Sequence, residues 1–390
     1  MAELEQTSTV KVYETFDEMG LSDTLIRGVY NYGFELPSKI QQLAIVPMSQ
    51  QTDILAQSQS GTGKTGAFTI GALSTVDPSL KAPQVLVMCP TRELSQQTER
   101  VAQAIGSYMN LKVLSATGGN QIRADVTALK GGAQFIVGTP GRIFDLICRG
   151  ELSVEHIRYV ILDEADQMLE DLFADQIRSI LNSKFPSTTR LALFSATMPK
   201  NVLEIAENYL SNPVRILLPP DEVTLEGIKQ YYVQLEREDW KLPVLLDLYQ
   251  QITVNQALIY VNKRQKAEWL AKQLSSHGFT LEFIHGEMEV AERKKRMEDF
   301  RSGMTRVLIS TDLLARGIDV QQVSLVINYE MPIQRENYIH RIGRSGRYGK
   351  KGSAINIICG DEINAVKEIE AHYSTIIMEL PEDLSSLSVA

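Results

Sequence analysis

The sequence predicts an α/β protein with two mostly parallel β-sheets, each flanked by helices. Short apolar runs rich in β-branched residues alternate with longer, charged stretches of helical character, and this pattern occurs twice along the chain. Strands that alternate with helices form parallel sheets that are covered on both faces. In the first half the runs lie at 53–57, 84–88, 112–116, 134–138, 159–163 and 190–194. In the second half they lie at 256–261, 280–285, 305–311, 324–329 and 353–358.

A proline-containing segment separates the two halves. Pro219 and Pro220 interrupt regular structure in LLPPDEVTLEG and stiffen the chain, so this segment is predicted to be a linker. A length of 390 residues fits two or three domains of roughly 100–200 residues each. The expected order is an N-terminal segment, a first domain, the linker and a second domain, at 1–43, 44–216, 217–227 and 228–390.

Composition and charge narrow the class of protein. With 44% hydrophobic and 22% charged residues, the chain has the composition of an ordinary globular protein. Its net charge of −9 argues against nucleic-acid binding by the whole surface, but residues 341–351 carry five cations and no acid. Three cysteines without a CxxC pair favour a reducing intracellular compartment over a disulfide frame or a zinc site. No apolar run reaches the ~18 residues of a membrane span, and the polar N-terminus does not resemble a secretory signal.

A phosphate-binding loop is predicted at SQSGTGKT, between the run at 53–57 and an apolar helix. The loop matches G-x-x-x-x-G-K-[ST], except that serine stands at the first glycine position. Its backbone and the helix N-terminus would hold phosphates, its lysine would meet the β- and γ-phosphates, and its last threonine would ligate Mg²⁺. The alternative is a glycine-rich turn without a ligand, which the strand–loop–helix context disfavours. The candidate ATP-binding residues here are Ser58, Gln59, Ser60, Gly61, Thr62, Gly63, Lys64 and Thr65.

Acidic residues follow the apolar run YVILD in the sequence DEAD at 163–166. Ligands of open α/β sheets bind beyond the carboxyl ends of the strands. Asp163 is therefore a candidate Mg²⁺ ligand, and Glu164 is a candidate base that orients or deprotonates the attacking water. The alternative is a solvated acidic helix start. Lys64, Asp163 and Glu164 are the catalytic candidates of the first half.

These motifs belong to an ordered series that resembles the DEAD-box RNA helicases. The further motifs are GFELPSKIQQ (33–42), PTRELSQQ (90–97), GG (118–119), TPGR (139–142), SAT (195–197), STDLLARGID (310–319) and HRIGRSGR (340–347). The resemblance runs from about Phe16 to Leu380 and is closest to translation initiation factor 4A and its exon-junction paralogue. Family members often open the phosphate loop with a small residue, as Ser58 does here. The resemblance implies two RecA-like domains with a cleft for ATP and RNA between them.

The segment 1–43 would read adenine through the family's Q motif. Phe34 can stack on the base, and the amide of Gln41 can pair with the adenine edge. Phe16 and Tyr30 are either further aromatic walls of that site or core residues, because Tyr30 also has the helical spacing of a packed face.

The resemblance also assigns roles in hydrolysis and coupling. Planar guanidinium groups suit the charge on a transferring phosphoryl group, so Arg344 and Arg347 would act as arginine fingers. Gly317 and Asp319 would contact the nucleotide. The coupling candidates that link ATP chemistry to RNA are Asp166, Ser195, Thr197 and His340.

The implied RNA contacts go to the sugar–phosphate backbone, which positions a strand without reading its bases. The 2′-OH would distinguish RNA from DNA. Family members often have a Gln-x-x-Arg pattern here, and Val290 stands at the position of the Gln. The resemblance therefore does not extend to the RNA or interdomain contact that this Gln would make in the second domain. The candidate residues are Pro90, Thr91, Arg92, Gly119, Thr139, Arg142, Arg293 and Thr311.

Two functions share this site. The first is an ATP-dependent RNA helicase that unwinds short duplexes locally by domain closure, in translation initiation and in the cytoplasm. The alternative is an ATP-locked RNA clamp in nuclear mRNA or rRNA processing. A DNA helicase or generic P-loop ATPase would need other motifs in the second domain. Expected cofactors are ATP and Mg²⁺. Expected partners are single-stranded RNA and a scaffold of the initiation machinery or exon-junction complex, with a monomer in isolation.

Overall fold

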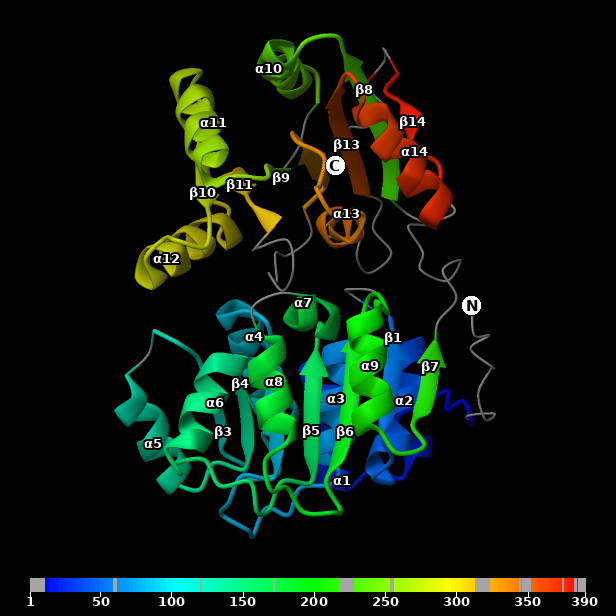
Figure 1. The fold of residues 1–390 in the computed structure, drawn as a ribbon, viewed down its shortest axis with the longest axis vertical. Coiled ribbons are helices and arrows are strands. Elements are labelled where there is room, and N and C mark those ends of the chain that lie inside the picture. The colour runs from blue at the N-terminus through cyan, green and yellow to red at the C-terminus, as the bar shows by residue number, and fades with distance from the viewer. Residues whose placement is uncertain are drawn as a thin grey trace. The chain divides into compact units, whose positions relative to one another are not determined.

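The computed structural model contains two compact units, Met1–Leu218 and Pro219–Ala390, which are described one at a time (Figure 1). The structure describes residues 11–58, 62–119, 121–170, 173–217, 228–252, 256–312, 323–343, 345, 352–373, 375–381 and 384. Nearly all of the predicted linker lies outside these residues. Among them, no helix is both long enough and apolar enough to cross a membrane.

The first unit is built on a seven-stranded parallel sheet with the order β3-β4-β2-β5-β6-β1-β7. Each connection between strands crosses over through a helix, as parallel pairing requires. The strands are β1 (Ile54–Gln57), β2 (Val85–Met88), β3 (Val113–Ala116), β4 (Phe135–Gly138), β5 (Tyr159–Asp163), β6 (Arg190–Ser195) and β7 (Val214–Leu217).

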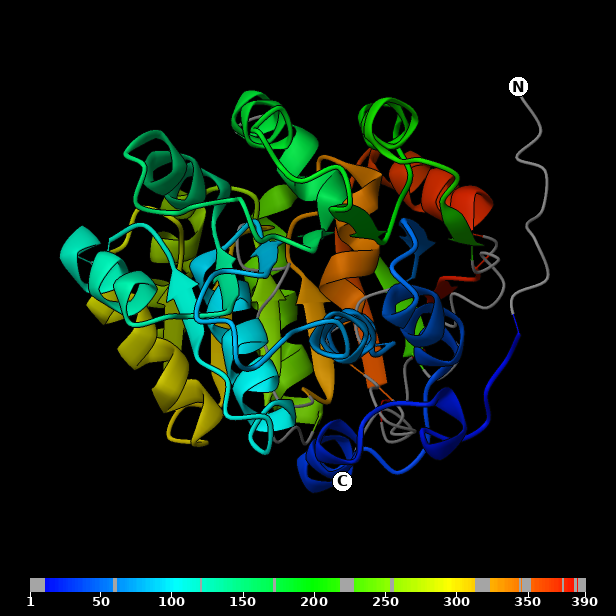
Figure 2. The ribbon, with the colours of Figure 1, turned by 90° about the horizontal axis from the view of Figure 1, so that it is seen from below.

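Two helical layers cover this sheet, because successive side chains of a strand point to opposite faces. Ile54 and Ala56 pack with residues of α1 to α4, whereas Leu55 packs with residues of α5 to α9. These two groups of helices lie on opposite faces of the sheet (Figures 1 and 2). The helices are η1 (Asp17–Met19), α1 (Asp23–Tyr32), α2 (Lys39–Ser49), α3 (Lys64–Leu73), α4 (Arg92–Ile105), α5 (Ile122–Lys130), α6 (Pro140–Cys148), α7 (Ala165–Glu170), α8 (Ala174–Leu181) and α9 (Lys200–Tyr209).

The second unit repeats this plan with a seven-stranded parallel sheet of order β10-β11-β9-β12-β13-β8-β14. Helices α10 and α11 cover one face, and α12, α13 and α14 cover the other. The strands are β8 (Ile228–Leu235), β9 (Ala257–Tyr260), β10 (Leu281–Ile284), β11 (Val307–Ser310), β12 (Leu325–Asn328), β13 (Gly352–Cys359) and β14 (Met378–Glu379). The helices are η3 (Glu238–Trp240), α10 (Lys241–Gln251), α11 (Arg264–Ser276), α12 (Val290–Arg301), α13 (Arg335–Ile342) and α14 (Glu362–Tyr373).

The predicted fold class is confirmed, and every apolar run that was predicted to be a strand contains one. Three strands are additional to that prediction, namely β7, β8 and β14. They form one side of their sheets and are less buried than the central strands. Their apolar signal is correspondingly weak, because an outer strand needs less apolar surface than a central one.

Candidate functional site

The phosphate-loop motif of the first unit connects the carboxyl end of β1 to helix α3. The backbone N–H of Ser58 donates to the Ser195 carbonyl, with an N–O distance of 2.9 Å, which ties the start of the loop to the end of β6. The Ser58 and Thr62 hydroxyl oxygens lie 2.5 Å apart. The serine at the first position of the motif is buried, and its hydroxyl is hydrogen-bonded to that of Thr62.

Gly63 is the position at which this loop requires glycine. Its φ is +98°, a conformation that side chains with a Cβ rarely adopt. A Cβ here would lie 2.7 Å from the Ser38 hydroxyl oxygen and 2.9 Å from Gln41 Nε2. Gly63 is thus closely packed against the segment that begins α2 and has no room for a side chain.

Gln41 links the predicted adenine-reading segment to the phosphate loop. Its side-chain carbonyl accepts from the Ser38 backbone N–H at 2.9 Å, and its amide Nε2 donates to the Gly63 carbonyl at 3.3 Å. The Phe34 ring lies beside it, against Gly66, where a Cβ would approach the ring edge to 2.8 Å. Phe34 and Gln41 therefore meet at the N-terminus of α3, next to Lys64 and Thr65.

The two other aromatic candidates of this segment differ in exposure. Phe16 is fully buried in the core, with its ring 6.2 Å from the Phe34 ring in a stacked arrangement. Tyr30 is exposed, and its hydroxyl donates to Asp17 at 2.5 Å. Phe16 thus supports Phe34 from the core side.

The acidic motif begins at the end of β5, close to α3. Lys64 Nζ lies 3.4 Å from Glu164 Oε1, and both side chains are about 95% buried. Glu164 has a φ of +54°, which is unusual for a residue other than glycine and is found at functional sites. Burial raises the pKa of the Asp163 carboxyl to about 7; the Glu164 charge adds to this rise, and the Lys64 ammonium opposes it.

Asp166 joins the acidic motif to the SAT motif that follows β6. Its backbone N–H donates to the Ser195 hydroxyl at 3.1 Å. Its carboxylate accepts from the Thr197 hydroxyl at 2.7 Å and from the Thr197 backbone N–H at 3.2 Å. Ser195 also accepts through its carbonyl from Ser58, so one connected set of hydrogen bonds joins all three motifs.

Another group of candidates follows β2, β3 and β4, strands that are neighbours in the first sheet. Thr91 caps α4 by accepting from the Leu94 backbone N–H at 3.2 Å. The Arg92 guanidinium lies over Gly119, where a Cβ would be only 2.5 Å from a terminal nitrogen, and φ at Gly119 is +86°. Thr139 occupies the position before α6, which begins with Pro140. Pro90 is buried and lies two residues beyond the end of β2.

Arg142 is the candidate whose surroundings the sequence alone did not indicate. Its guanidinium forms an ion pair with the Asp125 carboxylate from α5, and the two side chains are 8% and 3% exposed. Burial raises the pKa of Asp125, and the hydrogen bond and charge of Arg142 oppose that rise. Arg142 therefore anchors α6 to α5 in the described structure.

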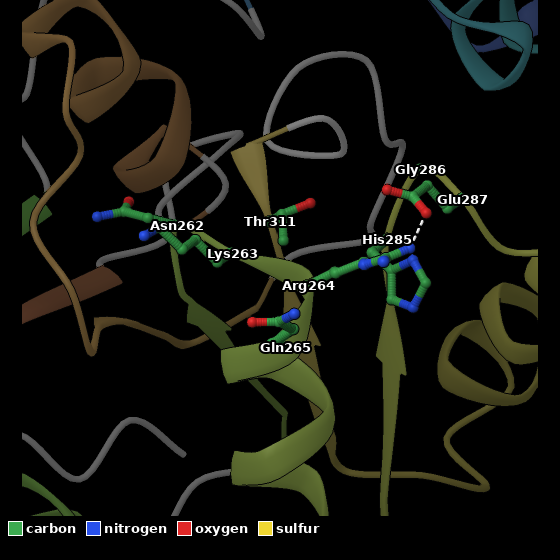
Figure 3. Close-up of a pocket in the computed structure, with 8 residues that line it drawn as sticks. All are labelled: Asn262, Lys263, Arg264, Gln265, His285, Gly286, Glu287 and Thr311. Atoms are coloured by element: carbon green, nitrogen blue, oxygen red, sulfur yellow. Dashed lines mark ion pairs between the residues drawn. The ribbon is translucent and has the colours of Figure 1, made fainter.

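In the second unit a pocket of about 450 Å³ opens at the carboxyl ends of β9, β10 and β11 (Figure 3). It contains Thr311, with Asn262 and the ion pair of Arg264 and Glu287 on opposite sides in this view. His285 also lines the pocket, and its Nε2 lies 3.2 Å from Glu268 Oε1. The full lining is Asn262, Lys263, Arg264, Gln265, His285, Gly286, Glu287 and Thr311.

The remaining candidates of the second unit are buried or lie outside the described residues. Arg293 and His340 are 7% and 1% exposed, on α12 and α13. The side chain of Val290 is outside the described part of the structure. The other candidates outside the described residues are Gly317, Asp319, Arg344 and Arg347 in the second unit and Gln59, Ser60 and Gly61 in the first.

Sequence reasoning missed Arg264, Glu287 and Arg341 as site residues. The sequence places Arg341 in the motif HRIGRSGR and in the basic segment 341–351 without an individual role, whereas in the structure it is fully buried and paired with Asp312. Its position beside His340 in a motif was the available signal. The partner of a buried arginine lies elsewhere in the chain, so its burial was not visible in the sequence.

Family comparisons cover both units. The family described as "DEAD/DEAH box helicase" matches residues 38–205. The family "Helicase conserved C-terminal domain" matches residues 240–349. The two matches follow one another along the chain, and each falls within one compact unit.

Individual relatives match over nearly the full length. The chain is 52% identical to "ATP-dependent RNA helicase eIF4A" of Neurospora crassa over 96% of this chain and 94% of the relative. It is 50% identical to the protein of that name in Schizosaccharomyces pombe, over 98% and 97%. Among solved structures, S. cerevisiae Dbp5 bound to RNA and ADP BeF3 gives a TM-score of 0.87 at 36% identity and covers 96% of this chain and 97% of Dbp5. The chain therefore belongs to the DEAD-box family of ATP-dependent RNA helicases.

Proposed function

We propose that Lys64, Asp163 and Glu164 form the hydrolytic centre of this RNA-dependent ATPase. The observation that carries the proposal is the contact between Lys64 and Glu164, which brings the phosphate-loop motif and the acidic motif together at one sheet edge. Lys64 supplies positive charge to the β- and γ-phosphates, and Glu164 orients or deprotonates the attacking water.

Magnesium fits the oxygen ligands that the chain offers. Asp163 supplies a buried carboxylate at the end of β5, and Thr65 supplies a hydroxyl in the first turn of α3. Asp163 is 2% exposed and lies beside the buried carboxyl of Glu164, and paired buried carboxylates of this kind suit a divalent cation. Asp163 and Thr65 would hold the ion, which would supply positive charge against the phosphates.

We assign ATP selectivity to Phe34 and Gln41 in the segment 1–43. Phe34 offers an aromatic face beside the loop. Beyond its hydrogen bonds to Ser38 and Gly63, the Gln41 amide has a second N–H and a second carbonyl lone pair with which to meet adenine. The domains at 44–216 and 228–390 then carry the two helicase halves. In the second, Gly317, Asp319, Arg344 and Arg347 would complete the nucleotide site, and His340 would take part in coupling.

RNA binding is proposed at the carboxyl edges of both sheets. In the first unit the contacts are Pro90, Thr91, Arg92, Gly119, Thr139 and Arg142, and in the second they are Arg293 and Thr311. Gly119 is exposed and lies beside the Arg92 guanidinium, so backbone and positive charge are offered together to a phosphate. Arg142 would have to share its guanidinium between Asp125 and RNA.

The hydrogen bonds of Asp166 to Ser195 and Thr197 support the coupling assignment. Asp166 is two residues from Glu164 in the chain. A movement of Glu164 would therefore shift Asp166 and, through its hydrogen bonds, Ser195 and Thr197 of the SAT motif. We propose that ATP-driven closure of the two domains bends bound RNA and separates short duplexes locally, and that hydrolysis reopens the protein.

The relatives named eIF4A support a role in translation initiation over the alternative of a nuclear RNA clamp. A cytoplasmic location and a scaffold protein of the initiation machinery follow from that role. The chain is proposed to act as a monomer when it is isolated from such a scaffold.

Duplex unwinding tests this function directly. The full chain should separate a short RNA duplex with ATP, and Arg347→Ala should still bind ATP but lose hydrolysis by an amount approaching about 10³-fold. Equal unwinding without ATP, or full hydrolysis by Arg347→Ala, would contradict the proposal.

A further inference from the structure

Arg341 on α13 is a fully buried cation whose guanidinium contacts three different parts of the second sheet. Its Nε donates to the Asp312 carboxylate at 2.5 Å. One terminal nitrogen donates to the Glu330 carbonyl at 2.6 Å and to the Asn328 side chain at 3.2 Å. The other donates to the Asn262 side chain at 2.8 Å. These bonds use the planar fork that distinguishes arginine from lysine.

The partners of Arg341 lie at the carboxyl ends of three adjacent strands. Asn262 follows β9, Asp312 follows β11, and Asn328 and Glu330 lie at and beyond the end of β12. In the sheet the order is β11, β9, β12, so one side chain joins three consecutive strand ends. Such a contact fixes the relative positions of loops that leave those strands.

One of these partners lines the pocket around Thr311, and another is next to Thr311 in the chain. Asn262 belongs to the lining (Figure 3), and Asp312 is the residue after Thr311. Asn337, one helical turn before Arg341, donates to the second Asp312 oxygen at 3.3 Å. On the other side, the Ser310 hydroxyl donates to the Thr311 carbonyl at 2.9 Å. The Thr311 carbonyl and the side chain of the next residue, Asp312, are therefore both held by hydrogen bonds.

We propose that Arg341 is a positioning residue for RNA binding, which acts by holding Asp312 and Asn262 and thereby fixing Thr311, and that its charge does not contact RNA. This inference rests on the proposed RNA contact of Thr311. It separates Arg341 from the other cations of segment 341–351. A guanidinium that is 0% exposed and engaged by four protein groups is not available to a phosphate.

Asp312→Asn distinguishes positioning from electrostatics by the sign of its effect. Asp312 is 28% exposed at the RNA edge, and removal of a negative charge there should strengthen RNA binding if only charge matters. If the contact to Arg341 positions Thr311, the same substitution should weaken binding, because a charge-assisted hydrogen bond is lost. Arg341→Lys keeps the positive charge but loses the fork, and should weaken RNA binding as well.

The experiment measures RNA-stimulated ATP hydrolysis by the full chain as RNA and ATP concentrations vary, with thermal unfolding as a check on folding. Thr311→Ala first tests the underlying contact and should raise the half-saturating RNA concentration. Asp312→Asn and Arg341→Lys should each raise that concentration by about tenfold and leave the KM for ATP within about twofold.

The outcomes separate the two proposals. If Thr311→Ala leaves the half-saturating RNA concentration unchanged, the proposed RNA contact of Thr311 is wrong. If Thr311→Ala weakens RNA binding but Asp312→Asn strengthens it or leaves it unchanged, only the role of Arg341 is overturned. Full RNA affinity in a folded Arg341→Lys protein would likewise overturn that role.

Discussion

Lys64 and Glu164 are 100 residues apart in the chain, and their side chains meet at 3.4 Å in the interior of the first unit. The contact connects the first turn of α3 with the end of β5. Because Asp163 and Asp166 are also buried, Lys64 supplies positive charge to a region rich in carboxylates. This contact has consequences for stability as well as for ATP.

Lys64→Met should destabilise the nucleotide-free protein. Removal of one partner of a buried ion pair leaves the other charge uncompensated, at a cost of about 3 kcal/mol or more in the free energy of unfolding. Glu164→Gln removes a negative charge next to Asp163 instead, and should be neutral or stabilising. Chemical denaturation of both variants measures this, and a Lys64→Met protein as stable as wild type would contradict the assigned ion pair.

Gly63→Ala should impair ATP binding because a Cβ would meet both Ser38 and Gln41. Gly150→Ala is the matched control, since Gly150 also has a positive φ, of +70°, but has open space around it. Both variants should lose about 1 kcal/mol or more of stability through backbone strain. Only Gly63→Ala should raise the KM for ATP. Equal KM values for the two variants would show that the packing at Gly63 is irrelevant to nucleotide binding.

Gln41→Ala should weaken the use of ATP and narrow the preference for ATP over GTP. Guanine presents an acceptor where adenine donates, and a mismatched polar group costs on the order of 1–3 kcal/mol, or about tenfold or more. The variant also loses the hydrogen bond to Gly63, so its KM for GTP should rise too. Ser58→Gly is the comparison and should keep the base preference. RNA-stimulated hydrolysis of both nucleotides measures these effects, and an unchanged preference in Gln41→Ala would move adenine recognition elsewhere.

Thr197→Val should lower the amount of duplex unwound per ATP hydrolysed. The substitution keeps the shape of the side chain but removes the hydroxyl that donates to Asp166 at 2.7 Å. Thr197→Ser, which restores a hydroxyl, should recover most of the yield. Parallel assays of unwinding and hydrolysis give this ratio, and an unchanged ratio in Thr197→Val would argue against a coupling role.

The fold was predictable from the sequence because the central parallel strands are buried on both faces. Runs such as YVILD are almost wholly apolar, and helical stretches separate them. Strand β8 was missed because only some of its residues are buried, and polar residues interrupt its apolar pattern. Strand β7 is short and half-buried, so its sequence is hard to distinguish from that of a loop.

The site was predictable where chemistry depends on local spacing, as in SQSGTGKT and DEAD. Contacts between distant segments were not visible. The pairing of Arg142 with Asp125 and of Arg341 with Asp312 depends on how helices pack, and side-chain type alone says nothing about it. The hydrogen bond from Gln41 to Gly63 is likewise invisible in the sequence, although both residues lie in recognisable motifs.

The most direct test of the central claim compares Glu164→Gln with wild type in RNA-stimulated ATP hydrolysis and in ATP-dependent RNA binding. The substitution keeps the shape of the side chain and removes the base. We predict that turnover falls by about 10²-fold or more, while RNA binding with ATP is retained. A Glu164→Gln protein that hydrolyses ATP at the wild-type rate when RNA is present would contradict the account.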